Sequence, residues 1–331
     1  MDLSIVLVNW NGLNVLRNCL VSIFGRSQDI EFEVILVDNG SQDGSVDAIK
    51  AEFPKVKVVQ NNNNVGFAAA NNQAFAVSRG RYVLLLNNDT VVLPNALSRS
   101  VRYLDQNPEA GVLGCRIEFP DRSFQTSCYR FTDLLELFMI RCLPLGSVRH
   151  ERFNVARYWG RQFTSPTPVD VVAGCFMLVR REIITTVGGL DEDFFMYGED
   201  EEWCSRIKKA GWLIIYFPQA TIIHIHRFSS GQVRRALQVT ECMAPVLVLH
   251  KRRGYLAAWI GNFILLVGLA VRIPAWLVFN PFKGLKCGSG EGLFWSQFEA
   301  LWAHLRGLVQ PIWIPVRRRE RGCCSEPVAT V

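Results

Sequence analysis

Three apolar segments of strand length end abruptly in Asn or Asp, and this pattern restricts the fold more than any other feature. The run from Tyr82 to Leu86 leads directly into Asn87, Asn88 and Asp89. Uninterrupted apolar runs are typical of buried parallel strands, and ligands of open α/β sheets bind beyond the carboxyl ends of such strands. The pattern therefore predicts a polar, anionic site at one sheet edge. The two earlier runs are Ser4–Val8, followed by Asn9-Trp10-Asn11-Gly12, and Val34–Val37, followed by Asp38-Asn39-Gly40-Ser41.

Strand and helix patterns alternate through the first 115 residues. Alternation at this spacing predicts an α/β fold with a mainly parallel central sheet and helices on both of its faces. The predicted strands are Leu3–Val8, Glu33–Val37, Val56–Gln60, Tyr82–Leu86 and Gly111–Cys115, and the predicted helices are Val15–Phe24, Val46–Glu52, Ala68–Ser78 and Asn95–Asp105.

The pattern weakens over residues 117–168, which we interpret as a variable insert that shapes an acceptor site. Periodic structure returns at Val169–Val179 and again after the acidic run Glu199-Asp200-Glu201-Glu202. Trp203 and Ile207 follow that run at helical spacing, and Gly211 stands where a helix C-cap glycine belongs. Trp212–Phe217 reads as another strand.

Composition excludes several classes of protein. The chain has 331 residues, is 49% hydrophobic and 20% charged, and so carries enough apolar material for a sizeable core. The formal charge of +6 is concentrated late in the chain and lacks the interleaved aromatic residues of a nucleic-acid interface. Ten cysteines without a CxxC pair indicate neither a zinc site nor a disulfide framework, which favours reduced thiols in the cytosol.

The C-terminal region has a membrane-like composition. Lys251-Arg252-Arg253 precedes the seventeen uncharged residues Tyr255–Val271, which as a helix extend about 25 Å, against about 30 Å for the hydrocarbon core. The segment is therefore either a tilted or re-entrant span, a helix in the interface with Trp259 and Trp276 at headgroup level, or a buried helix. Flanking cations and further tryptophans favour association with the cytoplasmic face of the membrane.

Carboxylates at the strand ends are the first candidates for chemistry. Asp38 can accept hydrogen bonds from a nucleobase or a ribose hydroxyl, or it can cap its own loop. Neither a Gly-x-Gly-x-x-Gly fingerprint nor a P-loop is present, so phosphates must be held in another way. Asp89 and Asn87 offer oxygen ligands to Mg²⁺ or Mn²⁺ bridging a diphosphate, although Asp89 can also simply close a turn.

The acidic run offers a general base. A base needs a carboxylate whose pKa is tuned by partial burial, and the apolar segment 194–198 supplies a wall for Asp200. Stabilisation of a helix start is by itself enough to explain Glu201 or Glu202. His224 and His226 alternate on a predicted strand, so only one of them faces the site, as a metal ligand or as a structural residue.

Seven motifs occur in an order that resembles a known family. The chain resembles the inverting, nucleotide-sugar-dependent glycosyltransferases of family 2, which have the GT-A fold. It looks more narrowly like the bacterial rhamnosyltransferase-like branch that builds O-antigen, exopolysaccharide or cell-wall glycans. The resemblance covers Leu3 to Ser230, and its motifs are SIVLVNWNG, ILVDNGSQDGS, NVGFAAANNQA, YVLLLNNDT, VVAGCFMLVRRE, VGGLDEDFFMYGEDEEWCSRIKKAGW and IIHIHRFSSG.

The resemblance implies a role for individual residues. Asp89 would contact a divalent cation, Mg²⁺ or Mn²⁺, with His224 as a second contact near the diphosphate. Asp200 would deprotonate the acceptor hydroxyl in a single inverting displacement. The residues implied at the nucleotide are Asn9 and Trp10 along the base, Asp38 at the base or ribose, Asn64, Gly66 and Asn71 near a helix start, and Asn87 and Asn88 in the place of the family's Asp-x-Asp signature.

The resemblance also implies an organisation and partners. Residues 1–245 would form the GT-A catalytic domain. The composition of residues 246–331, which follow the part covered by the resemblance, predicts a membrane-associated hydrophobic or amphipathic helical tail. The donor would be a nucleotide diphosphate sugar and the acceptor a glycan or polyprenyl-linked glycan, with no nucleic acid as partner. Asn87 replaces the family's first Asp and removes one charge from the cation site. The alternative is thus a non-catalytic sugar-nucleotide-binding or scaffolding protein of the same fold, against which Asp89, Asp200 and His224 argue.

Overall fold

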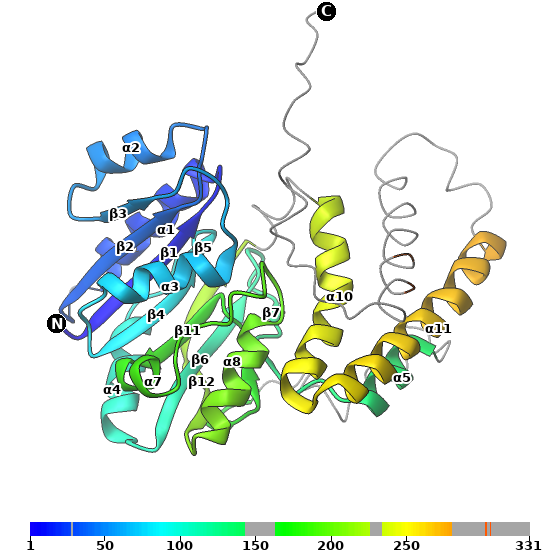
Figure 1. The fold of residues 1–331 in the computed structure, drawn as a ribbon. Coiled ribbons are helices and arrows are strands. Elements are labelled where there is room, and N and C mark those ends of the chain that lie inside the picture. Colours follow the sequence, from blue (N-terminus) through cyan, green and yellow to red (C-terminus); the bar gives the residue numbers. More distant parts are fainter. Residues whose placement is uncertain (28, 143–162, 226–233, 280–301, 303–304, 306–331) are drawn as a thin grey trace, which may run out of the picture.

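The computed structural model describes residues 1–27, 29–142, 163–225, 234–279, 302 and 305 (Figure 1). Within them, a mixed sheet of ten strands lies between helices, and a helical unit stands beside it. The elements are β1 (Leu3–Asn9), α1 (Leu13–Arg26), β2 (Phe32–Asp38), α2 (Ser45–Glu52), β3 (Lys57–Gln60), α3 (Phe67–Val77), β4 (Tyr82–Asn87), β5 (Thr90–Val92), α4 (Ala96–Gln106), β6 (Ala110–Glu118), β7 (Phe124–Gln125), β8 (Cys128–Tyr129), α5 (Leu134–Cys142), β9 (Thr167–Pro168), β10 (Val171–Val172), β11 (Phe176–Arg180), α7 (Arg181–Thr186), α8 (Glu199–Lys209), β12 (Leu213–His224), α10 (Arg234–Arg253) and α11 (Tyr255–Phe279).

The first half of the chain forms the parallel part of the sheet, as the alternating pattern predicts. The strand order is β3-β2-β1-β4-β11-β6-β12-β5, and the ladders β3·β2, β2·β1 and β1·β4 are parallel. Asn9 pairs with Asp38 in the β1·β2 ladder, and Val8 pairs with Asn87 in the β1·β4 ladder. The polar ends of the three apolar runs therefore meet at one edge of the sheet.

The sheet departs from the parallel pattern at β11, which is antiparallel to both β4 and β6. β11 follows the insert instead of a helical crossover, so no right-handed βαβ connection fixes its direction. β5 is also antiparallel, pairing with the end of β12. The sheet is consequently mixed, with parallel pairing restored between β6 and β12.

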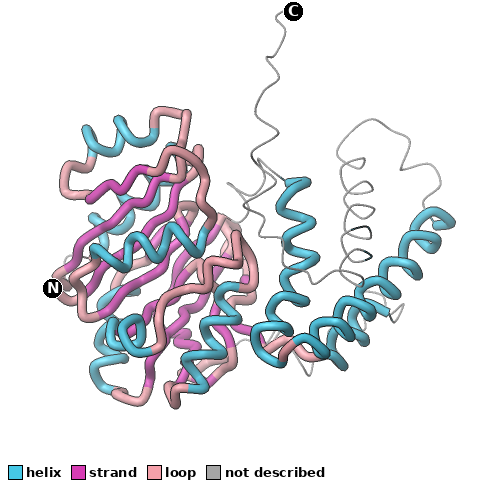
Figure 2. Tube along the Cα trace, viewed as in Figure 1, coloured by secondary structure: helices cyan, strands magenta, loops and turns pink. Residues whose placement is uncertain are grey.

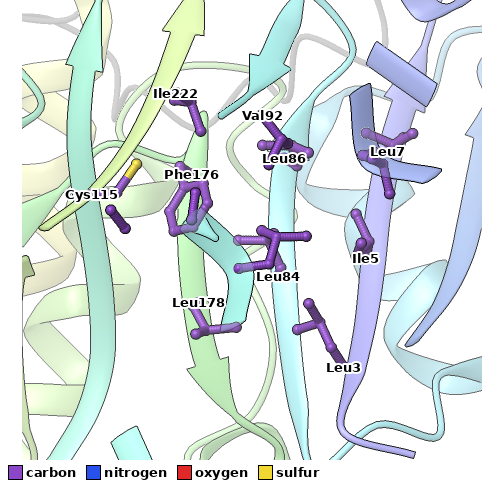
Figure 3. Close-up of a cluster of buried hydrophobic side chains, with 14 of the residues drawn as sticks. Leu3, Ile5, Leu7, Leu84, Leu86, Val92, Cys115, Phe176, Leu178 and Ile222 are labelled. Carbon is purple, nitrogen blue, oxygen red and sulfur yellow. The ribbon is translucent and has the colours of Figure 1, made fainter. Parts of the chain in front are cut away.

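Both faces of the sheet are buried, which explains the uninterrupted apolar runs. Alternate side chains of β1 and β4 point to opposite faces, because successive residues of a strand alternate. Leu3, Ile5 and Leu7 belong to the core shared with α1, α2 and α4, and Figure 3 shows them beside residues of β4, β11 and β12. Val6 and Leu85 belong to the opposite core, which α3, α7 and α8 cover.

The insert and the C-terminal region form one helical unit. α5 of the insert lies along α11, and α11 also packs on α10 (Figure 2). Leu137 of α5, Leu249 of α10 and Leu265 of α11 share a small buried cluster. The predicted division between residues 245 and 246 falls inside α10, so one continuous helix crosses it.

The described residues include no helix that combines the length and the hydropathy needed to span a membrane. Tyr255–Val271 is the segment for which the sequence left a span, an interfacial helix and a buried helix open. The segment lies within α11, where Ala258, Gly261 and Leu265 pack against the other helices of the unit. One face of this helix is used for protein contacts.

Candidate active site

Three strand ends are joined by a buried chain of amide and carboxylate contacts. Asn88 Nδ2 donates to Asn9 Oδ1 at 2.7 Å, and Asn9 Nδ2 donates to Asp38 Oδ1 at 3.0 Å. A Cβ at Gly12 would lie 2.7 Å from Asn88 Nδ2 and 2.8 Å from Asn9 Oδ1, so only glycine leaves room for this contact. The chain of contacts fixes the carboxyl ends of β1, β2 and β4 relative to one another.

Asp38 uses its carboxylate within the protein. Oδ2 accepts from the Ser41 backbone N–H at 2.8 Å, and Oδ1 accepts from the Ser41 hydroxyl at 2.6 Å. Its side chain is fully buried, as is that of Asn9. These contacts hold the loop after β2 against the end of the strand.

The other residues expected at the nucleotide differ in exposure. Trp10, Asn64 and Asn87 are partly exposed, whereas Asn71 is buried and donates to the Phe67 carbonyl. Gly66 adopts a φ of +90° at the start of α3, and a Cβ there would lie 2.7 Å from the Phe195 carbonyl oxygen. Gly66 thus lets the segment before α8 approach α3 closely.

The antiparallel β5·β12 ladder brings Asp89 and His224 together. His224 pairs with Thr90, and the Ile225 N–H donates to the Asp89 carbonyl at 3.0 Å. His224 Nε2 lies 3.2 Å from Asp89 Oδ1, and both side chains are buried. This contact joins residues 135 positions apart, and it matches the pair predicted at the cation. His226 lies outside the described residues.

The second ring nitrogen of His224 orients the imidazole. Nδ1 lies 3.3 Å from Gln125 Oε1 on β7, and Asn87 Nδ2 lies 3.3 Å from Nε2. In the tautomer that donates from Nδ1 to the Gln125 oxygen, the Nε2 lone pair would be available to a cation beside the Asp89 carboxylate. Nothing in the sequence distinguished Gln125, because its role depends on the β6·β7 hairpin.

The spacing of Asp89 and His224 suits two ligands of one divalent cation. Two ligands about 2.1 Å from a cation and at right angles lie about 3.0 Å apart, close to the observed separation of 3.2 Å. Among the described residues, no cluster of three or more His, Cys, Asp or Glu side chains is arranged to hold a metal.

Asp200 lies at the same sheet edge, held at the start of α8. Oδ1 accepts from the Glu201 N–H at 2.8 Å, and Oδ2 accepts from the Gly174 N–H at 3.3 Å. The next residue, Cys175, accepts from the Asn87 N–H at 3.1 Å. The two-residue segment Gly174-Cys175 therefore links the candidate base to the strand end that precedes Asp89.

The four carboxylates of the acidic run have separate environments. Burial raises the pKa of Asp200, while the two backbone N–H groups oppose the shift. Burial, with repulsion from Asp200, raises the pKa of Glu199 to about 8, and Glu199 Oε2 has no hydrogen-bond partner within the described part of the chain. Glu202 pairs with Arg206 one turn later at 2.8 Å. Glu201 is bound by Thr132 and Arg252.

Comparison with known proteins agrees with this arrangement. The family model described as Glycosyl transferase family 2 matches residues 4–188. N-acetylglucosaminyl-diphospho-decaprenol L-rhamnosyltransferase of Mycobacterium tuberculosis is 32% identical over 210 residues, which cover 60% of this chain and 68% of that protein. Rhamnosyltransferase WbbL of Escherichia coli is 29% identical over 163 residues, covering 49% of this chain and 59% of WbbL.

The fold is also found among solved structures. The mannosyltransferase PcManGT of Pyrobaculum calidifontis, solved with GDP-Man and Mn²⁺, superposes with a TM-score of 0.54 at 16% identity. The match covers 93% of this chain and 87% of PcManGT. At this identity the likeness concerns the fold, which is the GT-A-like arrangement expected from the sequence.

Proposed function

Because this chain belongs to glycosyl transferase family 2, we propose that it transfers a sugar from a nucleoside diphosphate donor to a lipid-linked glycan, with inversion at the anomeric carbon. Rhamnose is the first candidate sugar, since both curated relatives described above are named rhamnosyltransferases. The diphospho-decaprenol in one of those names supports a polyprenyl-linked acceptor. Such a reaction belongs to the synthesis of bacterial surface polysaccharide.

One observation carries the proposal: Asp200 and the strand end that precedes Asp89 both contact the Gly174-Cys175 segment, at the edge where β1, β2 and β4 end. Inverting transfer needs a base on one side of the anomeric carbon and charge neutralisation of the leaving diphosphate on the other. The partly exposed side chains Trp10, Asn64 and Asn87 lie on the nucleotide side of this edge in the proposal. The buried Asn9, Asp38, Asn71 and Asn88 then act by holding the edge in shape.

In the proposed transfer, a residue of this chain takes up the proton that the acceptor hydroxyl releases. Asp200 accepts the proton of the acceptor hydroxyl as the hydroxyl oxygen attacks, while the Gly174 and Glu201 N–H groups keep the carboxylate oriented. Asp89 and His224 would hold Mg²⁺ or Mn²⁺, and imidazole nitrogen favours Mn²⁺ of the two. When bound, the cation neutralises charge that develops on the diphosphate.

The outer face of α11 supports peripheral association with the cytoplasmic face of the membrane. Leu256, Trp259 and Phe263 follow one another at helical spacing and are 70%, 41% and 48% exposed. The Trp259 and Phe263 rings stack with centroids 6.1 Å apart. A helix whose first seventeen residues are uncharged and that presents a leucine and two aromatic rings is suited to the interface of a bilayer, where a polyprenyl-linked acceptor resides.

The test is release of nucleoside diphosphate by the purified full chain from a panel of sugar nucleotides, with Mg²⁺, Mn²⁺ or chelator and with bacterial membrane extract as acceptor source. We expect acceptor-dependent and metal-dependent turnover of one donor, with the rhamnosyl nucleotides tested first. Donor binding without turnover across the panel would replace the transferase with the non-catalytic sugar-nucleotide-binding alternative, which the Asn at position 87 favours.

A further inference from the structure

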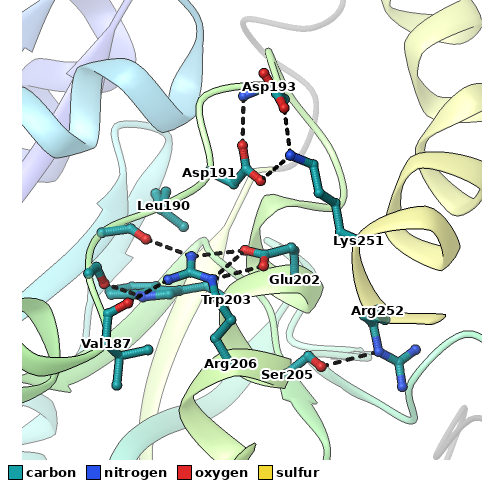
Figure 4. A network of polar contacts seen from close by, with 12 residues as sticks. Val187, Leu190, Asp191, Asp193, Glu202, Trp203, Ser205, Arg206, Lys251 and Arg252 are labelled. Carbon is teal, nitrogen blue, oxygen red and sulfur yellow. Dashed lines mark hydrogen bonds and ion pairs between the residues drawn. The ribbon is translucent and has the colours of Figure 1, made fainter. Parts of the chain in front are cut away.

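The C-terminal end of α10 contacts the segment that carries the candidate base. Lys251 and Arg252 are the last side chains of this helix before Arg253, and both form ion pairs with residues between positions 191 and 201. Figure 4 shows the contacts of Lys251 with Asp191 and Asp193 and the hydrogen bond of Arg252 to Ser205. From the sequence these cations were expected to face a membrane surface. Only Arg253 of the three is exposed, because the other two are engaged by the protein.

Arg252 joins three parts of the chain around Glu201. Its Nη1 donates to Glu201 Oε1 at 3.1 Å and to the Thr132 carbonyl at 2.9 Å, and its Nε donates to Ser205 Oγ at 3.3 Å. The guanidinium carbon lies 4.1 Å from the centre of the Phe131 ring, and the side chain is 10% exposed. A guanidinium with this many partners is held in one position.

Glu201 completes the connection from the other side. Its two oxygens accept from the Thr132 N–H at 2.6 Å and from the Thr132 hydroxyl at 2.8 Å. The Glu201 N–H is also the donor to Asp200 Oδ1. The insert, α10 and the first turn of α8 are therefore tied together one residue away from the candidate base.

Lys251 holds the approach to α8. Nζ lies 2.7 Å from Asp191 Oδ2 and 2.5 Å from Asp193 Oδ2. Three residues before Lys251 in α10, Val248 fills the space beside Gly198, where an added Cβ would lie 2.9 Å from Val248 Cγ2. Contacts from α10 thus reach both ends of the segment 191–201.

We propose that Lys251 and Arg252 are positioning residues for the Asp200 carboxylate, so that the C-terminal helical unit takes part in setting the catalytic geometry. The proposal rests on Asp200 being the base of the proposed transfer. Displacing a base by about 1 Å costs up to about a hundredfold in rate. The 3.3 Å contact between Asp200 and the Gly174 N–H leaves little room for the loop to shift before that contact is lost.

The test compares the full-length wild type with Arg252→Gln and a matched control, Arg180→Gln. Arg180 also has a partly buried guanidinium that donates to three carbonyls, those of Ala110, Leu104 and Asn107, but it pairs with Tyr82 at the opposite edge of the sheet. We expect R252Q to lower kcat by about tenfold to a hundredfold while the donor KM changes by less than about twofold. R180Q should lower thermal stability and keep kcat.

A kcat for R252Q equal to that of R180Q, in folded proteins, would overturn the proposal. Lys251→Gln is the second variant if R252Q does not fold, because the Lys251 side chain is more exposed, at 21%, than that of Arg252, at 10%. We expect K251Q to lower kcat in the same way, and an unchanged kcat would overturn the role of Lys251.

Hydrogen–deuterium exchange on the same proteins separates this proposal from the proposed function. Loss of the Arg252 contacts should increase exchange at residues 191–201 in R252Q but not in R180Q. Unchanged exchange at 191–201 would refute the positioning role whatever the activity. If R252Q shows increased exchange at residues 191–201 and the wild type shows no transferase turnover, the link between α10 and this segment is retained. Only the reaction assigned to Asp200 is then rejected.

Discussion

Replacing Asp200 by Asn tests the base assignment most directly. The carboxylate accepts two backbone hydrogen bonds, at 2.8 Å from Glu201 N and 3.3 Å from Gly174 N. An Asn carbonyl oxygen can keep the shorter bond, and the longer one is lost. Removing a buried charge beside Glu199 offsets that loss, so we expect the thermal midpoint to move by only a few degrees, since about 1 kcal/mol is at stake. Loss of a general base lowers the rate by about a hundredfold to ten-thousandfold, or about 3 to 5 kcal/mol of activation free energy.

The assay measures single-turnover sugar transfer and, separately, donor binding by calorimetry. We expect donor affinity to persist in D200N while transfer collapses, and Glu202→Gln is the matched control because Glu202 pairs with Arg206 of its own helix. In the wild type, activity should fall as the pH drops through the raised pKa of Asp200, because the protonated carboxyl cannot accept the acceptor proton. Wild-type transfer rates in D200N would refute the assignment.

Three further predictions concern stability and membrane binding. Gly66→Ala should lower the free energy of unfolding in urea more than Gly44→Ala does. Both glycines have a positive φ, which costs an alanine about 1 to 3 kcal/mol. Of the two, only an alanine at position 66 would also place its Cβ within 3 Å of a backbone atom. Equal losses would contradict the close approach. The pKa of Glu199 rises from 4.5 to about 8 on folding, so the stability this group contributes is lost as pH rises through that range. Glu199→Gln should flatten the decline, and an unchanged pH profile would show that Glu199 is not the cause. Trp259→Glu should reduce sedimentation with anionic vesicles, whereas Val21→Glu, at a site 62% exposed on α1, should not; equal sedimentation of both would argue against α11 as the membrane face.

Much of the fold follows from local sequence signals. Apolar runs at β1, β2 and β4 are buried on both faces, so each one identifies a central strand by itself. The polar residues that end these runs lie at one edge because parallel strands finish on the same side. The start of α8 was also predictable, since four acidic residues favour the positive end of a helix dipole, and Gly211 follows its last turn with a φ of +95°.

The roles of individual polar residues were less predictable. Asp38 is the last residue of β2 and Asp89 follows the end of β4 by two residues, and Asp38 accepts hydrogen bonds from its own loop. The sequence pattern treats the two alike, because it records where a strand ends and not which partners surround it. The ion pairs of Lys251 and Arg252 were not predictable for the same reason: charge and neighbouring hydropathy are similar for a membrane flank and for a cation that pairs with a carboxylate of its own protein, as Arg252 does with Glu201.

The sequence by itself thus determined the α/β architecture, the edge at which the site lies and the residue types available there. Only the tertiary structure decided which of them meet. The antiparallel pairing of β5 with β12 brings His224 to Asp89, and the helical unit of α5, α10 and α11 brings Arg252 to Glu201. Periodicity reports burial, which is a property of each residue with its near neighbours, whereas these contacts depend on strand direction and helix packing between segments 50 to 140 residues apart.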